Sequence, residues 1–294
     1  MITNKRIPLS YPFSLVKWDI LFTLIFSAGF HFFEEHIVHF SLPINIAAFL
    51  GTAIALILSF KLSQSYDRWW EARKIWGAIV NDSRTLITQL LAFNTLDEEV
   101  NQKMAYRQIG WCYSLGQHLR RLDALELLDN YVSEDEIQSV SKQHNVPLAL
   151  LMEHSMDISK LFKDEKINAF HQTQLDGTIA RLNASMGMAE RIKNTNFPRP
   201  YRLTLQFFIY LFLVILSLSL TELDSFIEIP LLMLIALPFF LLEKIAFRIQ
   251  DPFESRPMDT PMTAIARTIE INLKQLIGDT DVPEPLTSKK FYIL

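Results

Sequence analysis

Apolar and polar positions divide the chain into long blocks. Residues 42–60 and 203–221 are apolar runs without a charged side chain, and residues 20–33 and 229–242 form two shorter ones. A hydrocarbon core of about 30 Å requires about 20 predominantly apolar residues in a helix. Pro230 and Pro238 interrupt the last run, but neighbouring helices can satisfy the backbone groups that a proline frees. We therefore predict four membrane spans, at approximately 18–40, 42–62, 203–223 and 227–247.

The second apolar run continues into a polar stretch without a turn signal. The segment from Thr52 to Trp76 contains neither glycine nor proline, so nothing there ends a helix at the membrane surface. The residues that follow Phe60 are amphipathic and rich in tryptophan, arginine and acids. We predict one helix from Leu42 to Arg84 that crosses the membrane and enters the cytosolic part.

The middle of the chain, residues 63–202, has the pattern of amphipathic helices. Apolar residues recur at helical spacing at Ile109, Cys112, Leu115, Leu119 and Leu122, and Leu125, Leu127 and Leu128 follow before a break at Asp129-Asn130. Ser133 and Glu136 have the spacing of a capping box. Further helices are predicted at 166–191 and, within the proline-rich tail of residues 248–294, at 260–277. The fold class is all-α, organised as one unit.

Lysine and arginine orient the predicted spans. Neither residue type occurs between Trp18 and Phe60 or between Leu203 and Glu243. The positive-inside rule therefore places both termini and the long middle segment in the cytoplasm. The two outer connections carry acidic residues instead, which include Glu34, Glu35, Asp224 and Glu228.

Composition excludes several classes of protein. Half of the 294 residues are hydrophobic and 20% are charged, as expected for spans combined with a large polar part. A net charge of −4 and the lack of a basic run argue against nucleic-acid binding. The single cysteine excludes an internal disulfide, and the N-terminal residues lack the pattern of a cleaved signal peptide. No P-loop, GxSxG or CxxC motif is present, so we expect neither an enzymatic activity nor a cofactor.

One cluster resembles a set of metal ligands. The predicted outer end of the first span contains His31, Glu34, Glu35, His36 and His39. On a helix, His31 shares a face with Glu34 or Glu35, and Glu35 shares one with His39. A membrane metal-binding protein or oxidoreductase is therefore an alternative, although a wet and unliganded end of a span gives the same pattern. A non-conducting membrane scaffold whose cytosolic helices dock a partner is a further alternative.

The second span also carries a stripe that suits a pore. Thr52, Leu56 and Phe60 are spaced four residues apart and lie near one face of a helix. Around an axis of several copies they would form stacked rings about 6 Å apart. Apolar rings of this kind can gate ions by dewetting. The same residues could instead pack against a neighbouring span.

Residues 66–84, YDRWWEARKIWGAIVNDSR, resemble the signature of the bestrophin channels, especially their bacterial relatives. The matching positions are Arg68, Trp69, Trp70, Glu71, Arg73, Trp76, Gly77, Asn81, Asp82 and Arg84. SYPFSLVKWD at 10–19, AERIKNTNFPRPY at 189–201 and QDPFESRPMD at 250–259 support the resemblance. It implies a homopentamer around one central pore in the bacterial inner membrane, in contact with lipid and passing small monovalent ions.

The resemblance also assigns roles to individual residues. By register from the signature, the hydrophobic neck of the pore falls on Thr52, Leu56 and Phe60. Family necks are usually apolar at all three levels, so Thr52 is a departure. A second constriction is expected in the cytosolic part, with the apolar positions of helix 166–191 as candidates. We expect most charged signature residues to form structural pairs within or between subunits, because a buried charge requires a partner.

A calcium clasp follows the fourth span in animal bestrophins. Asp251-Pro252-Phe253 matches its turn, and Asp259 falls where one clasp acid would be. Arg248 and Arg256 occupy positions where oxygen ligands would be expected, whereas calcium requires six to eight oxygens. We therefore expect no calcium site, and structural ion pairs or caps at Asp251 and Asp259.

The sign of the permeant ion stays open. The animal family conducts chloride and other anions, which the resemblance extends to this chain. Repeated around a ring, the acids Glu34, Glu35, Asp224 and Glu228 would instead concentrate cations at the outer entrance. They could also face lipid headgroups or water away from the axis.

Overall fold

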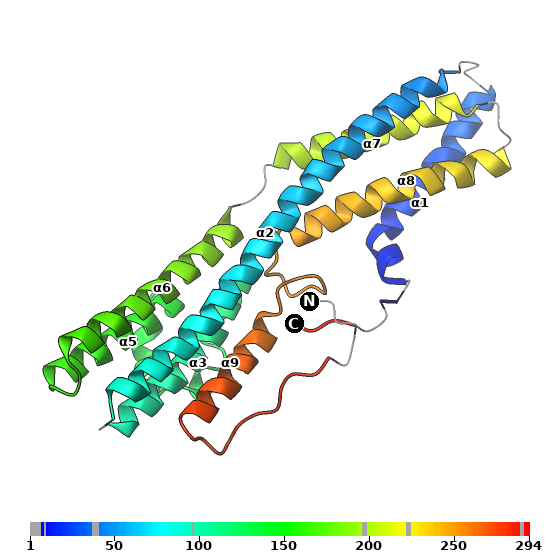
Figure 1. The fold of residues 1–294 in the computed structure, drawn as a ribbon. Coiled ribbons are helices and arrows are strands. Elements are labelled where there is room, and N and C mark those ends of the chain that lie inside the picture. The colour runs from blue at the N-terminus through cyan, green and yellow to red at the C-terminus, as the bar shows by residue number, and fades with distance from the viewer. Residues whose placement is uncertain are drawn as a thin grey trace. The chain divides into compact units, whose positions relative to one another are not determined.

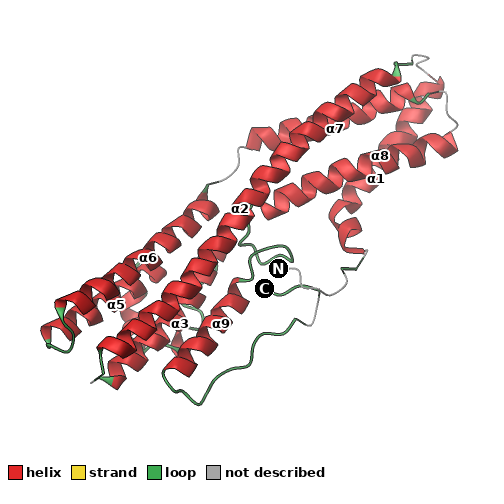
Figure 2. Cartoon of the chain, viewed as in Figure 1, coloured by secondary structure: helices red, strands yellow, loops and turns green. Residues whose placement is uncertain are grey.

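The computed structural model describes residues 7–8, 10–36, 41–95, 97–195, 199–221, 225–288 and 291–294. The regular elements of these residues are helical, as Figure 2 shows, which confirms the predicted all-α fold. The α-helices are α1 (Ser10–His36), α2 (Ile44–Phe93), α3 (Glu98–Arg120), α4 (Glu134–Val140), α5 (Val146–Lys163), α6 (Ala169–Asn194), α7 (Arg199–Ser219), α8 (Ser225–Ile249) and α9 (Met262–Leu276). A short 3₁₀ turn, η1, covers Leu128–Asn130.

The chain forms two compact units that share α2 (Figure 1). The apolar unit comprises residues 6–68 and 196–250. The described residues of the polar unit lie within 69–195 and 251–294. The boundary falls inside α2, between Arg68 and Trp69, yet the helix continues through it. This confirms the prediction that the helix does not end with its apolar run, and α2 extends beyond the predicted Arg84 to Phe93.

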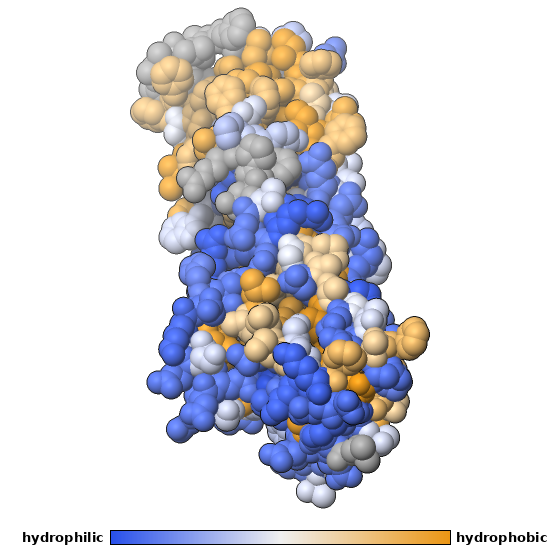
Figure 3. All heavy atoms as spheres, turned by 90° about the vertical axis from the view of Figure 1, so that its left-hand side faces the viewer, coloured by the Kyte–Doolittle hydropathy of each residue, from blue (hydrophilic) through white to orange (hydrophobic). Residues whose placement is uncertain are grey.

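The apolar unit contains α1, the first part of α2, α7 and α8. Four helices of the described chain are long and apolar enough to cross a membrane, and each contributes to this unit. Their common core joins Ala47, Ile54 and Leu58 of α2 to apolar residues of α7 and α8. A Cβ at Gly51 would lie 3.1 Å from the ring of Phe212, so the glycine permits close packing of α2 and α7. Figure 3 shows mostly hydrophobic residues over this unit.

The polar unit is built from the second part of α2 with α3, α4, α5, α6 and α9. Helix α3 packs against α5 and α9, and α5 packs against α6. The core includes the large side chains Trp76 and Trp111, both of them 0% exposed. Hydrophilic residues predominate on the surface of this unit in Figure 3.

Helix α3 ends earlier than its apolar pattern predicts. The pattern of apolar residues through Leu128 suggested that this helix continues to that residue, and this prediction is wrong. The helix ends at Arg120, because Arg121 adopts a left-handed conformation with φ of 61°. Its backbone N–H reaches the carbonyls of Gln117 and His118, which closes the helix in the manner usual for a glycine. Because this residue is not a glycine, the sequence did not indicate that the helix ends here.

The predicted cap of α4 is present in half of its expected form. The Ser133 hydroxyl accepts a hydrogen bond from the backbone N–H of Glu136 at 3.4 Å. The Glu136 carboxylate does not return to Ser133 as a full capping box requires, because it binds the guanidinium of Arg107. The sequence therefore identified the start of α4 but not the partner of the Glu136 carboxylate.

Candidate pore-lining site

The predicted neck residues lie on a face of α2 that their own chain leaves uncovered. Leu56 is 58% and Phe60 is 61% exposed, and Thr52 is also exposed. On the opposite face, Ile54 and Leu58 are each 1% exposed and belong to the core of the apolar unit. The apolar unit thus presents large apolar side chains outward along one stripe of α2.

Thr52 fits this stripe without an unsatisfied donor. Its hydroxyl donates to the backbone carbonyl of Ala48 at 2.8 Å, one helical turn earlier. The hydroxyl proton is therefore used within α2, and the oxygen keeps lone pairs for water or an ion. A threonine is accordingly the most polar of the three neck positions but not an exposed donor.

Polar groups behind the stripe tie α2 to the end of α8. Lys61 is 5% exposed and donates to the Gln250 side-chain oxygen at 3.0 Å. Arg68 donates from Nε to the Gln250 carbonyl, also at 3.0 Å. Glu243 is likewise buried and lies 3.4 Å from Nε of Arg202. Lys61, Arg68 and Glu243 thus each have a polar partner, as ionisable groups among membrane-type helices require.

Glu228 lies inside the apolar unit. It is 0% exposed and accepts hydrogen bonds from Ser217 at 2.8 Å and from Nδ1 of His31 at 3.1 Å. In the single chain its carboxylate thus links α8 to α7 and α1. The side chains of Glu34 and Glu35, and the whole of Asp224, lie outside the described residues, so the acidic outer ring stays a prediction.

The metal-like cluster is only partly described. His31 contacts Glu228, whereas the His36 side chain and His39 fall outside the described residues. In the part of the chain that the structure describes, no three His, Cys, Asp or Glu side chains come close enough to hold a metal ion.

The signature residues make contacts within one chain. Trp69 donates to the carbonyl of Met258 at 2.8 Å, and Trp76 lies in the core of the polar unit. Three of the charged residues form side-chain pairs: Arg84 with Asn272 at 2.9 and 2.6 Å, Asp82 with Arg181 at 2.8 Å, and Glu71 with Lys74 at 2.7 Å. Trp70 is 47% exposed, Asn81 is exposed, and Arg73 and Gly77 are half-buried.

Two acids of the segment after α8 bind a lysine of α6. Lys193 is 5% exposed, and its ammonium lies 2.9 Å from Asp251 and 2.5 Å from Glu254. Asp259 is 1% exposed and accepts hydrogen bonds from the backbone N–H groups of Glu254 and Arg256. Burial raises the pKa of Asp259 to about 6. The acids therefore form an ion pair and a loop cap inside one chain.

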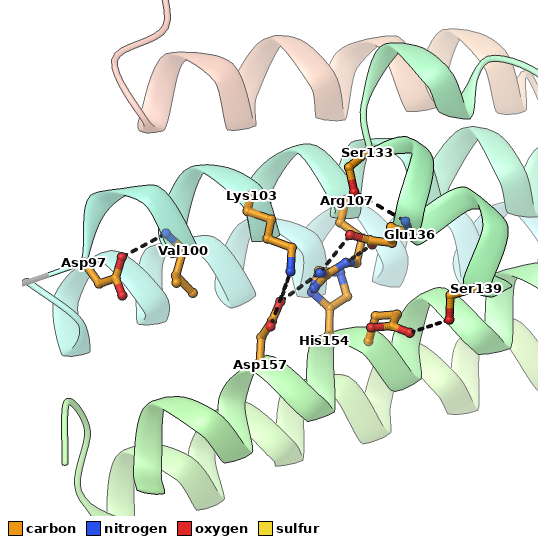
Figure 4. Close-up of polar contacts among 10 residues, drawn as sticks. Asp97, Val100, Lys103, Arg107, Ser133, Glu136, Ser139, His154 and Asp157 are labelled. Atoms are coloured by element: carbon orange, nitrogen blue, oxygen red, sulfur yellow. Dashed lines mark hydrogen bonds and ion pairs between the residues drawn. The ribbon is translucent and has the colours of Figure 1, made fainter. Parts of the chain in front are cut away.

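A buried cluster of charges had no motif in the sequence. Arg107 of α3 is 0% exposed and binds Glu136 of α4 and Asp157 of α5, the latter at 2.8 Å (Figure 4). His154 approaches it from α5, with Nδ1 3.5 Å from the guanidinium. Burial, followed by the charge of Arg107, lowers the pKa of His154 well below its ordinary value, so the imidazole is neutral. The cluster joins three helices of the polar unit.

The structure narrows the candidates for a second constriction. Leu175, Leu182 and Met186 of α6 are buried in the core of the polar unit, so they are not available to line a pathway. Phe170, at the start of α6, is 84% exposed. Exposure therefore singles out Phe170 among the large apolar side chains of this helix.

Comparison with protein-family models gives a match to bacterial and fungal bestrophin proteins over residues 13–275. Among curated proteins, the chain is 27% identical over 284 residues to the voltage-dependent anion channel-forming protein YneE of Escherichia coli K12. That alignment covers 96% of this chain and 93% of the relative. The protein of the same name from Salmonella typhi is 30% identical, with coverage of 83% and 80%.

Solved structures give the same result. A bacterial bestrophin homolog from Klebsiella pneumoniae superposes with a TM-score of 0.81 at 25% identity, covering 90% of this chain and 98% of that one. A crystal structure described as a membrane protein G264A gives a TM-score of 0.83, also at 25% identity. The similarity extends over both compact units.

Proposed function

Because the chain belongs to the bacterial and fungal bestrophin family, we propose that it forms a passive ion channel. Five copies surround one pore in the plasma membrane, which is the inner membrane of a bacterium. Both termini and the polar unit face the cytoplasm, as the distribution of lysine and arginine indicates. Conduction of this kind requires no catalytic step and no cofactor.

The observation that carries this proposal is the uncovered apolar stripe of α2. Leu56 and Phe60 are more than half exposed, although the opposite face of the same helix is fully packed. In a ring of copies, this stripe forms the neck, and its apolar side chains exclude water until the pore widens. Thr52 makes one end of the neck easier to wet. Phe170 supplies a second, separate constriction on α6.

Chloride and other small monovalent anions are the proposed permeant ions. The curated relatives carry the name of anion channel-forming proteins, which supports this assignment. Cation conduction is the competing assignment, because the outer connections carry acids that would attract cations. The reversal potential distinguishes the two.

The test is a bilayer recording under a KCl gradient, with wild-type protein and the variants Leu56→Ala and Leu234→Ala. We expect Leu56→Ala to raise the current several-fold, because a shorter apolar side chain widens and wets the neck. Leu234 of α8 is 67% exposed and undergoes the same chemical change outside the proposed neck, so its variant should conduct like the wild type. The sign of the reversal potential assigns the ion.

Other outcomes would overturn the proposal of a channel that is gated by the α2 stripe. An equal effect of both substitutions would place the gate elsewhere than on the α2 stripe. No current from protein that is oligomeric by light scattering would favour a scaffold. Near-stoichiometric metal in such protein would favour the metal-binding alternative instead.

A further inference from the structure

A groove in the polar unit shares no lining residue with the proposed neck on α2 or with Phe170. It runs between α4, α5 and α6 and has a volume of about 750 Å³. Small-molecule sites in proteins have volumes of about 300–1,000 Å³ and mostly apolar walls. The apolar lining of this groove comes from Val140, Leu148, Leu151, Met152 and Ile179.

The charged lining of the groove is acidic. Glu153 of α5 and Asp176 of α6 contribute carboxylates, and no lysine or arginine belongs to its lining. Glu153 accepts a hydrogen bond from Ser139 at 3.3 Å through one carboxylate oxygen, and its second oxygen remains for another partner. In the described part of the chain, Asp176 forms no ion pair, and partial burial raises its pKa. The groove therefore combines an apolar surface with negative charge that lacks a counterion.

The walls of the groove are held in place by the buried charge cluster. Helix α4 contributes Val140 to the lining and Glu136 to the cluster, and α5 contributes Met152 and Asp157 in the same way. Because both acids bind Arg107 of α3, the two helices are fixed before a ligand arrives. Such preorganisation lowers the entropy that binding must offset.

We propose that this groove binds a small organic cation with an apolar body, such as an arylalkyl amine. The ammonium group pairs with Asp176 and Glu153, and the apolar body packs on Leu148 and Met152. Methionine adapts to ligands of different shape because its side chain is unbranched and polarizable. An anionic ligand of the same shape would meet like charge and desolvate both carboxylates without compensation.

The direct test is calorimetric titration of the full-length oligomer with phenethylamine, with phenylacetate as the matched anion. We expect phenethylamine to bind and phenylacetate not to bind at the same concentration. Asp176→Asn combined with Glu153→Gln should weaken binding by about tenfold or more, because charge-assisted contacts are lost. Asp129→Asn, at an exposed acid outside the groove, is the matched control and should leave affinity within about twofold.

A second variant blocks the groove without removing charge. Ala180 belongs to the lining and is exposed, so Ala180→Phe should fill the space and abolish binding while the melting temperature stays close to that of the wild type. Equal binding of the two probes, or unchanged affinity in the double acid variant, would overturn the proposal. So would the absence of phenethylamine binding, which would indicate that a second copy of the chain covers the groove. None of these readouts depends on whether the protein conducts ions.

Discussion

The two halves of α2 belong to one continuous helix but differ in the polarity of their exposed side chains. Before Arg68, the outward side chains include Leu56 and Phe60, whereas beyond Trp69 they include Lys74 and Asn81. Both halves bury apolar residues on the inner face. A continuous helix therefore does not imply a uniform surface, because the exposed face carries large apolar side chains in the first half and polar ones in the second.

Trp76→Ala should be the most damaging single change in the second half of α2. The side chain is 0% exposed in the core of the polar unit, and removal of a buried large aromatic costs about 3–5 kcal/mol. Trp70→Ala removes the same side chain from an outward position, 47% exposed, and should cost less than about 1 kcal/mol. Thermal unfolding of both variants in detergent measures the difference. Similar melting temperatures would contradict the assigned inner and outer faces.

The polar unit also buries charge, which Glu136→Gln tests. Loss of the carboxylate leaves Arg107 buried with Asp157 as its remaining acid, which should cost about 3 kcal/mol. Glu134→Gln, an exposed acid in the first turn of the same helix, is the control and should cost less than about 1 kcal/mol. Unfolding by urea reports both values. A negligible cost for Glu136→Gln would show that Asp157 alone neutralises the guanidinium.

Asp259 makes the stability of the polar unit depend on pH. Its pKa is raised from 3.8 to about 6, so the folded protein binds the proton more tightly than the unfolded chain. This stabilisation is complete below the unfolded pKa and is lost as pH rises through about 6. Relative to Asp259→Asn, the wild type should thus lose up to about 3 kcal/mol between pH 4 and 7. Melting temperatures of both proteins across that range test this, and a constant difference would contradict it.

The first half of α2 offers a matched pair of leucines. Leu58→Ala creates a cavity in the apolar unit and should cost about 1–3 kcal/mol, less than in water because lipid also solvates leucine. Leu56→Ala should leave stability nearly unchanged and alter the current instead. Melting temperature and bilayer current, measured on both variants, separate packing from gating. A destabilised Leu56→Ala would show that the stripe is a packing surface.

The smallest effect is expected where the second half of α2 faces water. Glu71 and Lys74 are 2.7 Å apart, but their side chains are 37% and 58% exposed. Lys74→Ala should change the free energy of unfolding by no more than about 0.5 kcal/mol, and less in high salt. Denaturation at two salt concentrations tests this. A larger, salt-resistant cost would indicate that the pair is buried in the oligomer.

The features that the sequence predicted were the local ones. The absence of glycine and proline after Thr52 predicted the unbroken α2, and the Ser133 cap placed the start of α4. The end of α3 was missed because Arg121 takes the left-handed conformation without being a glycine.

The contacts that sequence reasoning missed join residues far apart in the chain. Lys103 and Arg107 share a face of α3, and His154 and Asp157 share one of α5, but nothing indicated that these faces meet. Likewise, the pairing of Arg84 with Asn272 depends on how α9 packs. Local propensity carries no information about such partners, which tertiary packing selects.

Lys193 makes the conformation of the segment after α8 independent of dissolved cations. If a dissolved cation bound between Asp251 and Glu254, the occupancy of that site would depend on the concentration of the cation in the cell. The ammonium of Lys193 is tethered to α6, so its effective concentration beside the two acids is set by the chain and not by the surroundings. This segment should therefore keep its conformation when chelators or divalent ions are added. Its conformation depends on a residue of the same chain and not on the ions in solution.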